Sequence, residues 1–109
     1  MPIAHQILRV YEAGPSVTVV GFGGAEIVDQ LDLSECREEI VSLLDQNDCK
    51  MLAIDLTGVR YIPSGMLGLL ASLCQMGIEV HLYNPSEDIR EVLQITRLDD
   101  ILQLHDIEV

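Results

Sequence analysis

The hydrophobic positions of the chain change their period within residues 51–70, where a continuous apolar run gives way to a helical stripe. Leu52, Ala53 and Ile54 form a short apolar run of the kind found in strands that are buried on both faces. A polar loop follows, and Pro63 favours the start of a helix. Apolar residues then recur at the spacing of one helix face. They are Leu67, Leu70, Ala71 and Cys74, and Met66, Leu69 and Leu73 widen the stripe.

The pattern before this stretch predicts a β-hairpin and a helix. Residues 7–11 are mostly apolar and predict a first strand, with a turn at residues 12–15. Alternating residues from 16 to 22 predict a second strand that pairs with the first. Asp32, with a glutamate three residues later, has the pattern of a capping box, and the stripe after it predicts a helix to about Gln46.

The pattern after it predicts two more strands with a helix between them. Residues 78–83 alternate between apolar and polar side chains, as in a half-exposed strand. Residues 84–86 favour a helix start, and Ile89, Val92 and Leu93 are expected on its buried face. Residues 101–105 predict a last short strand or an extended tail. The order β-β-α-β-α-β-α-β predicts an α/β fold, in which a mixed sheet is flanked by helices and strands separated by a helix run parallel.

Length and charge limit the kinds of function that the chain supports. A chain of 109 residues fits one domain, so we expect a single domain over residues 1–109. Eighteen acidic and six basic residues give a net charge of −12, which disfavours nucleic acid and anionic membrane surfaces as partners. The charge favours a protein partner with a basic face, or it serves only to keep the domain soluble.

The apolar runs are too short to predict a membrane span and the first residues do not have the pattern of a signal peptide, so we expect a cytoplasmic protein. The cysteines are odd in number and lack CxxC spacing, which predicts neither disulfides nor a zinc site. His5, His81 and His105 are scattered and match no metal or catalytic motif. We therefore predict no metal, no cofactor and no catalytic residue, and hence a protein that is not an enzyme.

Two residues near the centre of the chain are candidates for a functional role. Ser64 is expected at or beside the N-cap of a helix, where backbone N–H groups and the helix dipole favour an anion. Its hydroxyl could cap the helix, or it could accept a phosphate that changes what docks there. Asp55 ends the buried strand, and it could orient the loop over Ser64 or accept hydrogen bonds from that loop's backbone.

The same stretch resembles the signature of the STAS domain, the anti-sigma factor antagonist family. The family pattern is an apolar strand ending in Asp-Leu-Ser/Thr, then a loop, then Asp-Ser-Ser/Ala-Gly-Leu-Gly at the start of a helix. Residues 54–62 (IDLTGVRYI) and 63–70 (PSGMLGLL) are similar to it. Aligned without a gap, Pro63 replaces the Asp and Gly65 takes the place of the usual phosphorylated serine. A one-residue deletion would instead place Ser64 on the phosphorylated position.

The resemblance implies a regulatory module that binds an anti-sigma factor or a serine kinase of the GHKL type, with Ser64 as the phosphorylation candidate. The expected partner-binding residues are Asp55, Thr57, Pro63, Ser64, Gly65, Met66 and Leu67. The alternative is a scaffolding or self-association module, including a homodimer, that is not phosphorylated. A small anion or nucleotide at the Ser64 helix start is a third possibility. Family members often continue into a further C-terminal helix, which we expect to be absent here.

Overall fold

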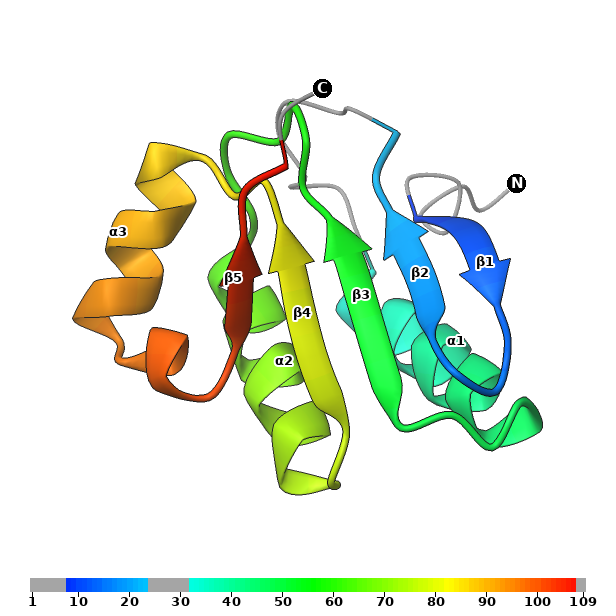
Figure 1. Ribbon diagram of the computed structural model, residues 1–109. Coiled ribbons are helices and arrows are strands. Elements are labelled where there is room, and N and C mark those ends of the chain that lie inside the picture. Colours follow the sequence, from blue (N-terminus) through cyan, green and yellow to red (C-terminus); the bar gives the residue numbers. More distant parts are fainter. Residues whose placement is uncertain (1–7, 24–31, 108–109) are drawn as a thin grey trace.

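The computed structural model describes residues 8–23 and 32–107, which form a five-stranded sheet with helices packed against it (Figure 1). In chain order the elements are β1 (Arg9–Ala13), β2 (Thr18–Gly21), α1 (Leu33–Gln46), β3 (Met51–Asp55), α2 (Ser64–Gln75), β4 (Glu79–Tyr83), α3 (Glu87–Ile95), the 3-10 turn η2 (Leu98–Asp100) and β5 (Gln103–His105). The predicted α/β order is thus confirmed.

The strands lie in the order β1-β2-β3-β4-β5, so neighbours in the sequence are neighbours in the sheet. β1 is antiparallel to β2, as expected of a hairpin, and all other pairs are parallel. The predicted boundaries of β1 were wrong by two residues, because Ala13 pairs with Thr18 and the chain turns over residues 14–17. Ile7, the expected first residue of β1, lies outside the described residues.

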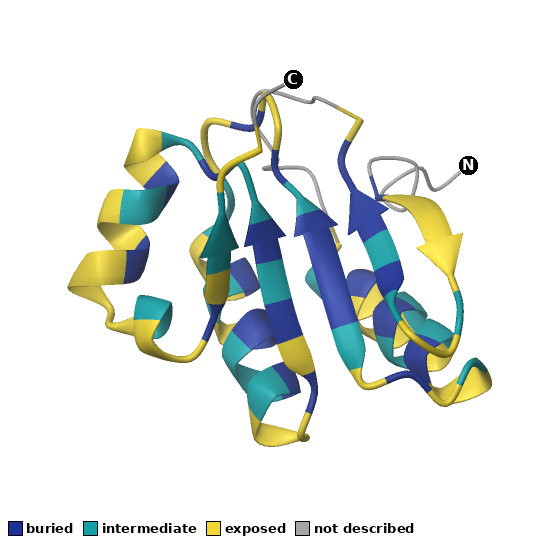
Figure 2. Ribbon diagram, viewed as in Figure 1, coloured by how far each residue is buried: buried dark blue, intermediate teal, exposed yellow. Residues whose placement is uncertain are grey.

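One face of the sheet carries the hydrophobic core. Leu52 and Ile54 of β3 and Val80 and Leu82 of β4 are at most 2% exposed. Helices α1 and α2 cover this face, and α3 lies beside the β5 edge (Figures 1 and 2). Each buried aliphatic side chain of this kind contributes about 1.5–3 kcal/mol to folding. The helices supply their own buried rows, which are Cys36, Ile40 and Leu44 from α1 and Met66, Leu69, Leu70 and Leu73 from α2.

Two predicted helix faces differ from the observed ones. The buried face of α2 is centred on the row that was expected only to widen it, and Leu67 and Cys74 are half-buried. This rotation follows from position, because α2 contacts both the sheet and α1. In α3, Ile89 and Leu93 are buried as expected, but Val92 is 42% exposed. That helix lies at the edge of the sheet, so only a narrow stripe of it is covered.

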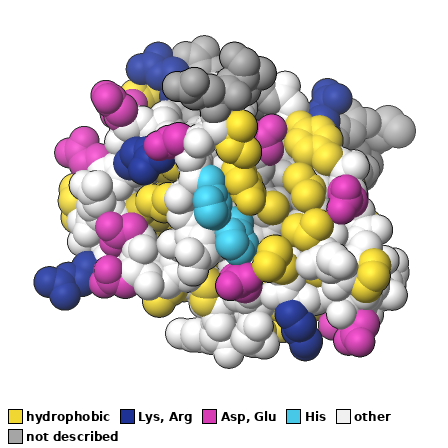
Figure 3. Space-filling view, viewed as in Figure 1, with side chains coloured by type: hydrophobic (Ala, Val, Ile, Leu, Met, Phe, Trp, Pro, Cys, Tyr) yellow, Lys and Arg dark blue, Asp and Glu magenta, His cyan; other side chains and the backbone are white. Residues whose placement is uncertain are grey.

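The other face of the sheet is open to solvent in the part of the chain that the structure describes (Figure 3). It carries apolar side chains over β2 and β3 and a pair of histidines on β4 and β5. A shallow hollow of about 480 Å³ lies on this face. It is lined by Val17, Val19, Ala53, Asp55, Thr57, Tyr83, Asn84 and Ile107.

Candidate functional site

The loop after β3 is held by a chain of side-chain hydrogen bonds. One carboxylate oxygen of Asp55 accepts from the backbone N–H of Thr57 at 2.9 Å and from its hydroxyl at 2.6 Å. The Thr57 hydroxyl oxygen accepts in turn from the side-chain amide of Asn84 at 2.9 Å. Asp55 therefore stabilises its own turn, which is the second of the two roles considered for it. Asp55, Thr57 and Asn84 all line the hollow on the open sheet face.

At the start of α2 the hydroxyl of Ser64 does not serve as a cap. Pro63 occupies the N-cap position, with φ −66° and ψ 148°, and makes no side-chain capping hydrogen bond. Ser64 is the first helical residue and is exposed. The backbone N–H of Met66 bonds to the carbonyl of Pro63 at 2.9 Å, which closes the first turn. An exposed hydroxyl thus lies in the first turn, where backbone N–H groups lack helical partners.

The start of α3 is built differently and is tied to the loop that precedes Ser64. The hydroxyl oxygen of Ser86 accepts from the backbone N–H of Ile89 at 3.1 Å, which caps α3. The same hydroxyl donates to the carbonyl of Arg60 at 2.9 Å. One serine therefore fixes both the first turn of α3 and the loop that leads into α2.

A groove of about 350 Å³ runs between these two helix starts. It is lined by Arg60, Tyr61, Ile62, Ser64, Leu67, Asp88, Ile89, Glu91, Val92 and Ile95. Tyr61 is 46% exposed and Ile95 is 74% exposed, so much of the apolar lining is accessible. The sequence interpretation missed the α3 contribution. Its signal was an apolar residue at 95, which falls outside the buried stripe of that helix.

The seven residues predicted to bind a partner do not form one surface. Ser64 and Leu67 line the groove, and Pro63 precedes them. Gly65 lies on the side of α2 that faces α1, where an added Cβ would be 2.4 Å from Cδ1 of Leu33. Met66 is 2% exposed and belongs to the core. A further residue pair, Asp55 and Thr57, lies at the sheet-face hollow instead.

The charges around the groove are unequal. Arg60 lies over the ring of Tyr61, with its guanidinium carbon 5.3 Å from the ring centre. Asp88 and Glu91 provide acidic groups from α3. A phosphate on Ser64 would lie close to these two acidic side chains as well as to the start of α2, whose dipole favours negative charge.

Thiol groups near the two core helices have raised pKa values. Burial, with a smaller contribution from Glu39, raises the pKa of the Cys36 thiol to about 11. Burial also raises the pKa of Cys74. Both thiols are therefore neutral at pH 7 and are poor nucleophiles.

Within residues 8–23 and 32–107, no group of three or more His, Cys, Asp or Glu side chains is placed to hold a metal ion. Over the same residues, no helix is both long enough and apolar enough to span a bilayer. The groove at Ser64 offers an exposed hydroxyl, apolar side chains and backbone N–H groups, which suit binding and modification.

A family model described as STAS domain matches residues 11–108. The fold is similar to that of the anti-sigma factor antagonist SpoIIAA in its unphosphorylated form, with 18% identity and a TM-score of 0.73 over 93% of this chain and 88% of that one. It is also similar to an anti-sigma-factor antagonist (STAS) domain protein from Planctomyces limnophilus, with 20% identity and a TM-score of 0.72 over 93% and 91%. The fold is similar as well to that of the Bacillus cell fate determinant SpoIIAA in the phosphorylated form, with 18% identity and a TM-score of 0.66 over 93% of this chain and 91% of that one.

Proposed function

Because the chain belongs to the STAS domain family, we propose that it is a regulatory binding module of the anti-sigma factor antagonist kind. In this role it binds an anti-sigma factor or a GHKL-type serine kinase through the groove between α2 and α3. It acts by binding and not as an enzyme, and it works in the cytoplasm. The net charge of −12 supports a partner whose contact surface is basic.

The observation that carries the proposal is the exposed hydroxyl of Ser64 at the rim of an accessible apolar groove. Tyr61, Val92 and Ile95 expose 42–74% of their surface there. Val92 and Ile95 lie outside the part of α3 that packs on the core, which is formed by Ile89 and Leu93. Apolar side chains left accessible next to polar ones are typical of protein interaction sites.

Phosphorylation of Ser64 is the proposed control. The hydroxyl does not cap α2, so modification would break no capping bond there. A phosphate of about −2 charge would be stabilised by the helix start. It would also place a strongly hydrated group at the edge of apolar surface that a partner must cover. Docking would therefore weaken, because covering the phosphate would require the removal of its tightly held water.

The test is intact-mass spectrometry of the purified domain after incubation with ATP and a GHKL-type serine kinase from the same genome, followed by fragment mapping. We expect one added phosphate on Ser64, and none in Ser64→Ala. Ser42→Ala is the matched control, since Ser42 is an exposed helical serine on α1. Phosphate on any residue other than Ser64 would contradict the proposed site.

The alternative function is a constitutive scaffolding or self-association module. It is favoured by the position of Gly65, which takes the place of the family's usual phosphorylated serine in the ungapped alignment and has Leu33 of α1 as its neighbour. No added phosphate, together with kinase binding that is equal for the wild type and Ser64→Ala, would support this alternative. A dimer seen by light scattering with no kinase binding would indicate self-association.

A further inference from the structure

The open face of the sheet carries a histidine pair that plays no part in the groove (Figure 3). Nδ1 of His81 on β4 lies 2.8 Å from Nε2 of His105 on β5, although the two residues are 24 positions apart in the sequence. The strand register brings them together. His105 pairs with Tyr83, two residues after His81, so both histidines project from the same face of neighbouring strands. Two nitrogens of the kind that binds metal ions thus lie side by side.

The distance between the two nitrogens is that of two neighbouring ligands of one metal ion. Nitrogens that are each about 2.0 Å from an ion, at right angles to each other, are about 2.8 Å apart. Ligands of a tetrahedral ion at the same bond length are about 3.3 Å apart. The observed 2.8 Å therefore favours the square-planar or octahedral geometry of Cu²⁺ and Ni²⁺ over the tetrahedral geometry of Zn²⁺.

One ring nitrogen of the pair donates a hydrogen bond to the other across this distance. A metal ion would take the place of that hydrogen. The displaced hydrogen would move to the other nitrogen of the donor ring, so that both imidazoles stay neutral, which is the form that binds metal ions. Binding at this pair thus needs no change in the net charge of the two rings.

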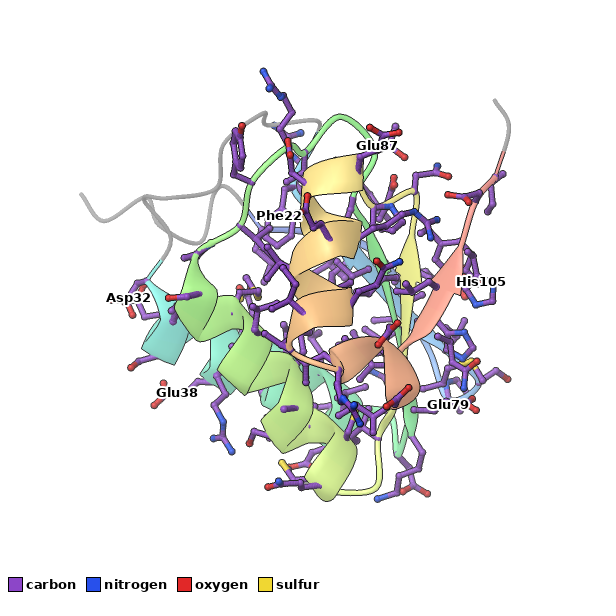
Figure 4. The ribbon with its side chains drawn as sticks, turned by 90° about the vertical axis from the view of Figure 1, so that its left-hand side faces the viewer. Phe22, Asp32, Glu38, Glu79, Glu87 and His105 are labelled. Atoms are coloured by element: carbon purple, nitrogen blue, oxygen red, sulfur yellow. The ribbon has the colours of Figure 1, made fainter. Side chains whose placement is uncertain are left out.

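Neighbouring side chains hold the two rings in place. The ring of Tyr83 stacks on His105, with centres 4.7 Å apart and planes that differ by 18°. Nε2 of His81 is buried, makes no hydrogen bond, and lies 3.2 Å from a carboxylate oxygen of Glu79. Figure 4 shows Glu79 and His105 on the open side of the sheet. A carboxylate beside the second nitrogen of a metal-binding histidine orients the ring and makes it a better ligand.

The protein supplies two ligands at this place, and water would supply the others. Asp55 ends β3 and Asp106 follows β5, but each has a partner of its own. Asp55 accepts from Thr57, and Asp106 accepts from Arg90. A site with two imidazoles suits an ion that keeps water among its ligands. It is also in keeping with the finding that residues 8–23 and 32–107 hold no metal-binding group of three or more such side chains.

We propose that His81 and His105 form a two-imidazole site for a divalent late transition-metal ion of the Cu²⁺ or Ni²⁺ type, with Glu79 as the residue that positions His81. A bound ion would join β4 to β5, the outer strand, which has three residues. The same two histidines are 24 positions apart in the unfolded chain, so the site exists only in the folded protein. The proposal is independent of the function assigned to the Ser64 groove.

The first experiment locates the ion in the wild-type chain by NMR at pH 7.5. NiCl₂ is added to the isotope-labelled protein, and amide signals are followed, because hydrated Ni²⁺ is paramagnetic and broadens the signals of nearby nuclei. We expect residues 79–83 and 103–106 to broaden before the acidic segment 35–39 of α1. MgCl₂ is the control for the acidic surface, since Mg²⁺ prefers oxygen ligands, and it should leave the signals of residues 79–83 and 103–106 unchanged.

The second experiment measures the affinity for NiCl₂ by calorimetry at the same pH. We expect His105→Gln and His81→Asn each to weaken binding by at least about tenfold, and Glu79→Gln to weaken it by about tenfold. His5→Gln is the matched histidine control. Glu12→Gln removes the same charge from an exposed position on β1. Both controls should bind Ni²⁺ as the wild type does.

Three results would overturn the proposal. The first is broadening in the wild type that is centred outside residues 79–83 and 103–106, a result that does not depend on how the variants fold. The second is an affinity for Ni²⁺ that is equal in the wild type and in His105→Gln. The third is no binding of Ni²⁺ at millimolar concentration. Equal effects of Glu79→Gln and Glu12→Gln would overturn the positioning role of Glu79.

Discussion

The starts of α2 and α3 lie on opposite sides of one groove, yet their N-termini are capped in different ways. α3 begins with a serine whose hydroxyl caps the helix and bonds to the carbonyl of Arg60. α2 begins with a proline at its N-cap and an exposed serine one position later. The same type of side chain is therefore committed to structure at Ser86 and left available at Ser64. Whether a serine hydroxyl at a helix start is available for modification depends on whether the serine occupies the N-cap position or the position after it.

The largest expected effect on stability comes from the turn after β3, in the loop that leads to α2. In Thr57→Val, the carboxylate of Asp55 loses its closest donor and the amide of Asn84 loses its acceptor. We expect the free energy of unfolding to fall by about 1–3 kcal/mol, as measured by urea denaturation. Thr96→Val is the control, because its exposed hydroxyl bonds only to helix carbonyls, and its loss should be smaller. Equal losses in the two variants would contradict the prediction that the hydrogen bonds of Thr57 stabilise the fold more than those of Thr96.

Ser86→Ala should have the next largest effect. It removes the cap of α3 and leaves the carbonyl of Arg60 without the hydroxyl donor. We expect a loss of about 1–2 kcal/mol by the same measurement. Ser64→Ala removes no capping bond and should change stability by less than about 0.5 kcal/mol. If the two variants were equally destabilised, the contrast between the two helix starts would be wrong.

A negative charge at position 64 should sharpen the contrast in the other direction. Ser64→Asp places a carboxylate in the first turn of α2, where the helix dipole favours it by about 0.3–1 kcal/mol at low salt. We expect a small gain in stability that shrinks at 1 M salt, because exposed charges are screened there. The same variant should bind the kinase more weakly than Ser64→Asn, which is nearly equal in size and uncharged.

The smallest effect on stability is expected at the outer end of the groove. Ile95 is 74% exposed, so Ile95→Glu should change the free energy of unfolding by less than about 0.5 kcal/mol. Partner binding, measured by calorimetry, should nevertheless weaken at least about tenfold, since a buried charge in an interface is costly. Glu38→Ala, an exposed α1 residue, is the control and should leave binding unchanged. Unaltered affinity in Ile95→Glu would place the interface elsewhere.

The order and type of the elements were predictable because each one carries its own local period. The capping side chain of Asp32 accepts from Glu35 at 3.1 Å, as its spacing indicated. The alternation in residues 78–83 likewise produced β4, with Val80 and Leu82 inward. Signals of this kind need only a few neighbouring residues, so they survive in the sequence.

The site was less predictable because its contacts join distant residues. Ser86 and Arg60 are 26 positions apart, and the two histidines are 24 apart. Nothing in the local pattern indicates which of several serines will bond across helices. The exposure of Val92 was missed for a related reason, since helical periodicity gives the apolar face but not how much of it a neighbouring element covers.

The two outer strands bear on how the chain behaves at high concentration. An outer strand offers unpaired backbone groups to which another chain can add. β1 has an irregular register between Val10 and Glu12 and carries exposed Arg9 and Glu12 along it, while β5 offers three residues beside α3. A bulge, charges and short length each disfavour strand addition. Among the residues that the structure describes, both outer strands therefore disfavour the addition of a strand from another chain.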